Sequence, residues 1–166
     1  MIWIVGILAL LGLTITVIVI MGRRLPVKHT ATASATFDMP VDVVWKKIIA
    51  FEDVSQWRPS VKQVEHVSGD GVGAVWRETG SDGKIPYQTL EMSPPRKLVR
   101  KIADPKLPFG GSWTYEITPN RSACTLTITE NGEVYNPVFR FVSRHVMGHN
   151  KSIESYLKDL KIALAK

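Results

Sequence analysis

A run of twenty residues near the start, from Ile2 to Met21, constrains this chain more than any other stretch. The run, IWIVGILALLGLTITVIVIM, carries no charge. As a helix it would be about 30 Å long, which matches the hydrocarbon thickness of a bilayer. A cleaved signal peptide would need a basic segment before a shorter apolar run and a small-residue cleavage site after it, and neither is present. We therefore predict an uncleaved transmembrane helix over residues 1–22.

Three basic residues follow the apolar run and are expected to flank the membrane: Arg23, Arg24 and Lys28. Positive residues favour the inner side, so the N-terminus is expected outside and the remaining chain in the cytoplasm. The one cysteine, Cys124, excludes an internal disulfide and is compatible with a reducing compartment. The sequence therefore predicts a single-pass cell-membrane protein that contacts membrane lipids through residues 1–22. Residues 23–29 form a basic linker and residues 30–166 a cytoplasmic domain.

The net charge of +6 is weak evidence for nucleic-acid binding. The chain has 21 lysines and arginines against 15 acids, and three of those basic residues precede Thr30, which leaves 18 against 15. Phosphate binding needs a concentrated basic face. Acidic residues at Glu52, Asp53 and Glu65 interrupt the basic residues near Trp45 and Trp57. We expect no nucleic acid as a partner.

The pattern of apolar residues predicts an α+β domain. Residues 31–39 alternate as a strand, Pro40 starts a helix with Trp45 on its apolar face, and residues 52–57 form a second short helix. Six segments then read as strands bounded by turn residues: 61–67, 73–79, 86–92, 97–103, 112–118 and 123–130. Short connections favour antiparallel hairpins, so the sheet should have seven antiparallel strands.

The last part of the chain predicts a long helix from Val138 to about Ala165. Asn136 and Pro137 suit its start, and Gly148 marks a bend or a close approach. Its apolar stripe comprises Val142, Val146, Ile153, Tyr156, Leu157, Leu160 and Leu164. A curved sheet needs its concave face filled, and this helix can fill it while leaving a cavity between helix and sheet.

Several motifs in this order resemble the START/Bet v 1-like superfamily (SRPBCC), in particular its polyketide cyclase/dehydrase and lipid-transport group. The similar segments are MPVDVVWKKIIAFEDVSQWRPSV (39–61), Gly71-x-Gly73, LEMSPPRKLVRKI (90–102) and YLKDLKIAL (156–164). The resemblance covers residues 30–166 and omits the apolar run. It implies a helix-grip fold with a hydrophobic pocket. Members of the superfamily bind lipids, sterols, hormones, polyketides or quinones, a minority catalyse reactions, and no catalytic motif is common to all.

Strand parity and loop positions nominate the residues of such a pocket. Gln88, Leu90 and Met92 should share one face, and Trp113 and Tyr115 another. Glu130 should follow Leu126 and Ile128 inward or, like Glu78, Glu91 and Glu116, face solvent. The candidate pocket residues are Trp57, Gln88, Leu90, Met92, Phe109, Trp113, Tyr115, Glu130, Phe141 and His145. A one-residue slip in register would reverse every such assignment.

Two segments could control entry to the pocket. The loop at residues 104–111 is long and rich in proline and glycine, and is expected to expose Phe109. The other is the start of the last helix, where apolar residues flanked by Arg140 and Arg144 could touch a membrane interface or merely pack on the sheet: Val138, Phe139, Phe141 and Val142.

The sequence offers no metal or cofactor motif. His145 and His149 are four residues apart, a spacing that can chelate a metal, but HVMGH lacks the acid of a zinc-protease motif. No hydrolase or phosphate-loop pattern occurs, and Cys124 within a strand favours a buried structural thiol. We expect no metal and no cofactor.

The sequence is compatible with two functions. The favoured one is a non-enzymatic binding module for a hydrophobic or amphipathic small molecule, such as a lipid, isoprenoid or polyketide. The alternative is a cyclase or dehydratase that uses Glu130, Tyr115 or a histidine in acid–base roles. The enzyme requires a buried polar cluster inside the pocket, and an entirely apolar lining would count against it.

Overall fold

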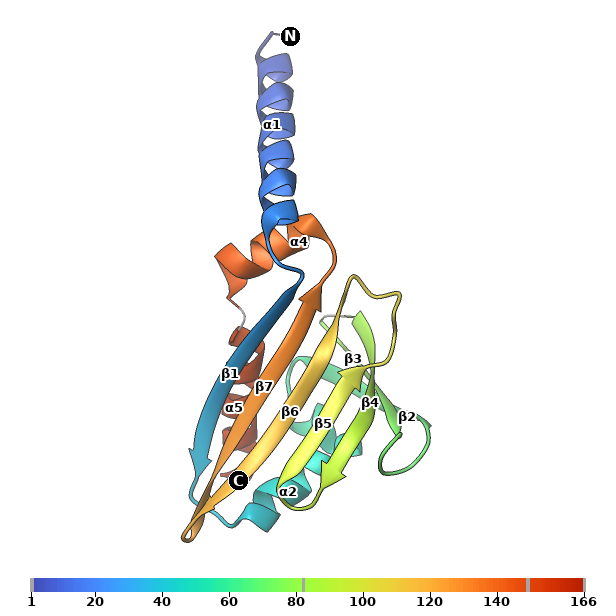
Figure 1. Ribbon diagram of the computed structural model, residues 1–166, viewed down its shortest axis with the longest axis vertical. Coiled ribbons are helices and arrows are strands. Elements are labelled where there is room, and N and C mark those ends of the chain that lie inside the picture. Colours follow the sequence, from blue (N-terminus) through green and yellow to red (C-terminus); the bar gives the residue numbers. More distant parts are fainter. Residues whose placement is uncertain (1, 82, 149, 166) are drawn as a thin grey trace.

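The computed structural model describes residues 2–81, 83–148 and 150–165 (Figure 1). A seven-stranded antiparallel sheet forms its centre, in the order β1-β7-β6-β5-β4-β3-β2. The strands are β1 (Lys28–Phe37), β2 (Val61–Ser68), β3 (Val75–Gly80), β4 (Gly83–Ser93), β5 (Lys97–Ile102), β6 (Phe109–Asn120) and β7 (Ala123–Val134). The predicted α+β class with seven antiparallel strands is confirmed.

Strict alternation of side chains gives the sheet one buried and one exposed face. In β7, Cys124, Leu126 and Ile128 are buried, while the threonines between them face outward. On the outer face the Ser34 and Thr127 hydroxyls lie 2.8 Å apart across β1 and β7. A period of two is what a half-buried strand requires. The inner face of β7 therefore contributes to the core, and its outer face carries a ladder of hydroxyl pairs.

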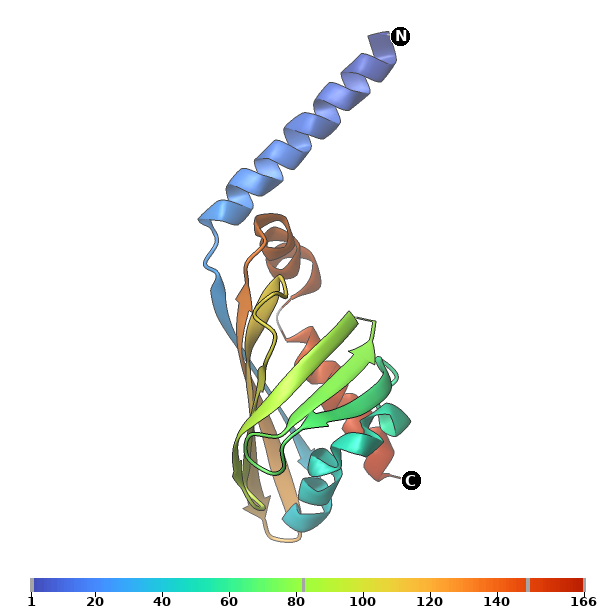
Figure 2. The same ribbon diagram turned by 90° about the vertical axis from the view of Figure 1, so that its right-hand side faces the viewer.

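Helices cover the concave face of the sheet (Figure 2). The segments α2 (Val41–Ile49), η1 (Phe51–Asp53) and α3 (Val54–Trp57) close one end, and α5 (Lys151–Leu164) packs along the face. The expected core position of Trp45 is confirmed, since this side chain is 5% exposed. The cluster between sheet and helices includes Trp57, Leu98, Tyr115, Ile117, Leu126, Ile128, Ile153, Tyr156, Leu157 and Leu160.

The C-terminal helix is divided, whereas the sequence predicts a continuous helix from Val138. It consists of α4 (Pro137–Val142), one π-helical turn η2 (Ser143–Met147), and α5. Gly148 separates η2 from α5 with φ 74° and ψ 147°, a conformation that residues with a side chain rarely adopt. The predicted bend at Gly148 is confirmed. His149 and the side chain of Val146 lie outside the described residues.

The helix α1 (Ile2–Arg24) projects away from the sheet (Figure 1). Most of its described apolar side chains are exposed, for example Leu11 at 55%. Among the described residues, α1 is the one helix long and apolar enough to cross a membrane, and its length and composition fit an anchor or a signal sequence. Its final turn packs on α4, where a Cβ on Gly22 would collide with the carbonyl of Pro137.

Candidate ligand-binding site

Four polar side chains from β3, β4, β5 and the end of α3 meet on the concave face. Alternation points Glu78 of β3, Thr89 of β4 and Arg100 of β5 inward, where they are 7%, 1% and 6% exposed. Arg58 follows α3 directly, because that short helix ends at Trp57. Charged side chains are almost never buried without partners. The concave face therefore holds a polar site within an otherwise apolar core.

Glu78 bridges the two arginines. Its Oε1 accepts a hydrogen bond from Arg100 Nη1 at 2.9 Å, and its Oε2 accepts one from Arg58 Nη1, also at 2.9 Å. One carboxylate between two guanidinium groups leaves a net positive charge in the protein interior. Such a charge is costly to bury unless further acceptors or negative groups approach it.

Aromatic rings surround these charges. The Arg100 guanidinium carbon lies 4.3 Å from the ring centre of Phe51 and 4.8 Å from that of Tyr87. Arg58 lies 5.0 Å from the ring centre of Tyr156. The negative face of an aromatic ring attracts a cation, so the rings partly replace the water that each arginine loses. They also hold the guanidinium planes in fixed orientations.

Five buried side-chain polar atoms have no hydrogen-bond partner among the described residues; four of them belong to this cluster, and the fifth belongs to Trp57, the neighbour of Arg58 in the chain. These atoms are Trp57 Nε1, Arg58 Nε, Thr89 Oγ1, Arg100 Nε and Arg100 Nη2. Four of the five are N–H groups, which can only donate, and the threonine hydroxyl can donate as well. An unsatisfied buried donor costs about 1–3 kcal/mol. The arrangement therefore presents a concentrated set of donors suited to acceptor oxygens.

Burial changes the ionisation of the groups around Glu78. Burial raises the pKa of Tyr87, Tyr115 and Tyr156, so these phenols keep their protons at neutral pH. Burial acts to lower the pKa of Arg58, but the charge of Glu78, with smaller contributions from the tyrosines, outweighs it and raises that pKa. The site thus contains cations and neutral hydroxyls around one carboxylate.

A second buried carboxylate, Glu130 of β7, lies on the same face near the start of α5. Its Oε2 accepts hydrogen bonds from Trp113 Nε1 at 3.1 Å and from Ser152 Oγ at 3.2 Å. His29 Nε2 lies 3.4 Å from Oε1. The inward alternative for Glu130 is confirmed, because it continues the buried alternation of Leu126 and Ile128. Trp113 and Tyr115 also contact the core cluster.

The predicted shared face of Gln88, Leu90 and Met92 is wrong. A register shift between Thr89 and Glu91 interrupts the pairing of β4 with β5. Such a bulge adds one residue and reverses the parity of those that follow. Met92 therefore packs against the core, while Leu90 is 45% exposed and Gln88 lies between the inward positions 87 and 89.

The remaining candidate residues lie toward the end of the sheet that adjoins α1. Phe109 is the first residue of β6, pairs with Val134 of β7 and is half-buried, so the expected long exposed loop is shorter than predicted. Phe141 and His145 contact each other across α4 and η2, with ring centres 4.8 Å apart. His145 itself is exposed.

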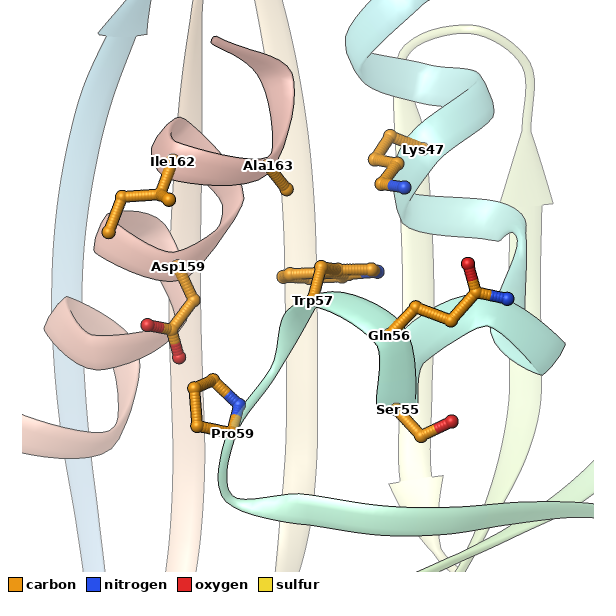
Figure 3. Close-up of a pocket in the computed structure, with 8 residues that line it drawn as sticks. All are labelled: Lys47, Ser55, Gln56, Trp57, Pro59, Asp159, Ile162 and Ala163. Carbon is orange, nitrogen blue, oxygen red and sulfur yellow. The ribbon is translucent and has the colours of Figure 1, made fainter. Parts of the chain in front are cut away.

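Trp57 lies between the interior cluster and an open hollow. Its ring makes an edge contact with Tyr156 at 5.2 Å on the interior side. Its other side lines a hollow of about 320 Å³ between α3 and α5, with Lys47, Pro59, Asp159 and Ala163 around it (Figure 3). The hollow lies outside the space between the concave face of the sheet and α5. Of the ten candidate pocket residues, Trp57 is the one that lines it.

Four residues of the site, Tyr87, Thr89, Arg100 and Tyr156, were not among the pocket residues predicted from the sequence. A signal was present in β5, where Arg100 shares its parity with the apolar Leu98 and Ile102. An arginine in an apolar series is unusual enough to suggest a buried charge. The sequence places Arg58 directly after Trp57 but does not show that it is buried. The expectation that Glu78 faces solvent is wrong, since its side chain points inward and is 7% exposed.

The described residues contain neither a group of potential metal ligands nor an exposed thiol. Among the described residues, no three histidine, cysteine or acidic side chains are grouped to hold a metal ion. Cys124 is fully buried, and burial raises the pKa of its thiol. A protonated thiol is a poor nucleophile.

These features define a helix-grip domain, in which a curved antiparallel sheet closes around a C-terminal helix. The sequence model of the family described as polyketide cyclase/dehydrase and lipid transport matches residues 28–161. The chain therefore belongs to this family, and the predicted START/Bet v 1-like resemblance is confirmed at that level.

Solved structures of other proteins share this fold. A START superfamily protein from Mycobacterium smegmatis is 13% identical, with a TM-score of 0.67 over 82% of this chain and 97% of that one. Norcoclaurine synthase from Thalictrum flavum is 10% identical, with a TM-score of 0.68 over 84% and 88%. A protein from Thermobifida fusca is 20% identical, with a TM-score of 0.66 over 82% and 93%. A search of curated proteins finds no match.

Proposed function

We propose that this protein is a membrane-anchored binding module for an amphipathic small molecule whose oxygen-bearing head binds the Arg58–Glu78–Arg100 cluster. The observation that carries the proposal is the set of five buried polar atoms that have no hydrogen-bond partner within residues 2–81, 83–148 and 150–165, and that belong to this cluster or to the adjacent Trp57. A head group with acceptor oxygens would satisfy these donors, and a negative charge on it would offset the second guanidinium.

The apolar part of the ligand has a matching surface next to Arg100. Arg100 pairs with Thr89 on β4 and with Trp113 on β6. Tyr87 and Trp113 make an edge contact at 5.6 Å and are both half-buried, which leaves ring surface for an apolar tail. Phe109 continues the inward parity of Trp113 toward α4. A ligand would therefore lie with its head at Arg100 and its tail toward the end of the sheet that adjoins α1.

Entry of the head group requires local movement. Trp57, Tyr115 and Tyr156 are each 9% exposed and fill the space between the arginines and α5. The ligand would reach the cluster from the side of Tyr87 and Trp113, displacing these rings rather than occupying an open chamber. The apolar contacts would supply most of the affinity, and the polar atoms would fix the orientation.

The anchor supports this function because a ligand dissolved in the bilayer would be concentrated next to the domain. The basic residues at the domain end of α1, Arg23 and Arg24 in its last turn and Lys28 at the start of β1, support an orientation with the domain in the cytoplasm. The membrane anchor and the cytoplasmic location of the domain are both proposed.

The test is extraction and mass spectrometry of small molecules from the full chain purified in mild detergent. The matched variant carries Arg58→Met, Glu78→Leu and Arg100→Met together, since replacing a whole buried charged group by apolar residues often preserves the fold. We expect a molecule with acceptor oxygens to accompany the wild type and an outer-face control, Thr127→Val, but not the triple variant. Equal recovery from all three proteins, or from none, would refute the proposal.

A second candidate function is an enzyme of the cyclase or dehydratase kind. The specific observation in its favour is the same buried polar cluster, because acid–base chemistry needs polar groups inside the site. The protonated hydroxyls of Tyr87, Tyr115 and Tyr156 could donate to a substrate oxygen, and Arg58 and Arg100 could stabilise an oxyanion. Incubating the recovered molecule with fresh protein separates the two functions, since a binding module returns it unchanged.

A further inference from the structure

The short helix α4 and the turn η2 form a surface beside the end of α1 that the ligand-binding role does not explain. Three apolar side chains there are exposed: Tyr135 at 45%, Val138 at 39% and Phe139 at 41%. Neither the sheet nor α5 covers them. Figure 1 shows α4 directly beneath the point where α1 leaves the domain.

This surface is fixed to both the sheet and α1. The Arg140 side chain donates hydrogen bonds to the carbonyl oxygens of Val134 at 3.0 Å, Tyr135 at 2.9 Å and Leu25 at 2.8 Å. Gly22 of α1 approaches the carbonyl of Pro137 so closely that no side chain would fit between them. The orientation of α4 relative to α1 is therefore set by specific contacts.

The charge around α4 is positive. Arg23, Arg24 and Arg144 are exposed, and no acidic residue occurs between Val134 and Glu154. The nearest acid in the sequence, Glu133, accepts a hydrogen bond from the Tyr135 hydroxyl at 2.7 Å and lies 3.8 Å from Lys28 Nζ. Exposed apolar side chains beside exposed cations are the composition of a surface that lies in the headgroup region of an anionic bilayer.

We propose that α4 lies in the headgroup layer of the bilayer that α1 spans, with Val138 and Phe139 at the acyl boundary and Arg23, Arg24 and Arg144 at anionic phosphates. The proposal rests on the proposed function, because it requires α1 to cross the membrane. The partner is an anionic phospholipid surface. Its consequence is that the Phe109 end of the concave face is held against the membrane, where a lipid-soluble ligand would enter.

Spin labels on introduced cysteines test this arrangement in the full chain. The native Cys124 is fully buried with a raised pKa, so it should not react with the label. Three variants are compared in nanodiscs that contain phosphatidylglycerol: Phe139→Cys in α4, Leu11→Cys in α1, and Val72→Cys in the turn between β2 and β3. Circular dichroism matching the wild type shows that each variant is folded. The relative accessibility of each label to oxygen and to a water-soluble nickel complex reports its depth.

We expect the label at position 11 to show the accessibility ratio of the hydrocarbon core and the label at position 72 that of bulk water. The label at position 139 should have a ratio shifted clearly from that at 72 toward that at 11. Replacing phosphatidylglycerol by neutral phosphatidylcholine, or adding Arg144→Gln, should move position 139 back toward 72.

Each contrary result has a distinct meaning. An aqueous value at position 11 overturns the membrane anchor, and with it the proposal for α4. A hydrocarbon value at 11 with an aqueous value at 139 overturns the α4 proposal alone. Immersion of 139 that does not depend on lipid charge overturns the contact with anionic phosphates.

Discussion

The two buried carboxylates of the sheet, Glu78 and Glu130, lie on the same concave face but have different partners. Glu78 bonds to two guanidinium groups, whereas Glu130 accepts hydrogen bonds from the neutral donors Trp113 and Ser152, with His29 nearby. Glu78 lies in β3 and Glu130 in β7, two strands separated by three others in the sheet. Two carboxylates that are buried to a similar extent can therefore have different roles, because the partners of each carboxylate decide whether its removal leaves buried charges or neutral donors without an acceptor.

Glu78→Gln is expected to cause the largest loss in the free energy of unfolding. The substitution leaves Arg58 and Arg100 facing each other without a counter-charge, and breaking one member of a buried ionic group typically costs about 3–5 kcal/mol. Urea unfolding of the full chain in mild detergent, followed by tryptophan fluorescence, measures this loss. If the loss were smaller than that caused by Glu130→Gln, the distinction between the two carboxylates would be wrong.

The next effect is a loss of stability at alkaline pH that depends on the tyrosines around Glu78. Their pKa values are raised by burial, so the folded chain holds protons that the unfolded chain releases. Stability is therefore fully present below about pH 10 and declines as pH rises toward the folded pKa values, with a limiting slope of about 1.4 kcal/mol per pH unit for each tyrosine that stays protonated only in the folded chain.

Urea unfolding at a series of alkaline pH values measures this slope. Tyr156→Phe should reduce it by the share of one tyrosine, while Thr127→Val on the outer face should leave it unchanged. An unaltered slope in Tyr156→Phe would show that burial does not protect this hydroxyl.

A smaller effect is expected from Glu130→Gln. The amide oxygen can still accept hydrogen bonds from Trp113 and Ser152, so the change weakens charge-assisted bonds without leaving a buried charge. The expected loss is about 1 kcal/mol. A double-mutant cycle with Trp113→Phe should show coupling of similar size, whereas a cycle that pairs Glu130→Gln with Glu78→Gln should be nearly additive.

The smallest effect belongs to the outer face of the same strand. Thr127→Val removes the hydroxyl contact to Ser34 in a position where water can replace it, so stability should change by no more than about 0.5 kcal/mol. The same unfolding measurement applies. A loss comparable to that of Glu130→Gln would mean that the hydroxyl ladder contributes more than its exposure suggests.

Much of the fold could be predicted because its signals are local. The alternation in β7, the apolar face with Trp45 in α2, and Gly148 as a bend all follow from neighbouring residues, and the structure confirms them. The inward alternative for Glu130 followed from the same alternation. The face of Gln88 and Leu90 could not be predicted, because one bulge at residues 89–91 reverses parity without a distinctive residue in the sequence.

Periodicity and charge are properties of a linear chain, so the sequence sufficed to predict the order of strands and helices and the long apolar helix at the N-terminus, though not the division of the last helix into α4, η2 and α5. The meeting of Arg58, Glu78 and Arg100 was decided by the folded chain, because these residues come from three separate parts of the sequence and the buried parity of Arg100 does not name its partners. Their meeting depends on how the sheet curves and on where α3 ends. The physical reason is that the burial and the partners of a charged side chain depend on the groups around it, and those groups come together only when the chain folds.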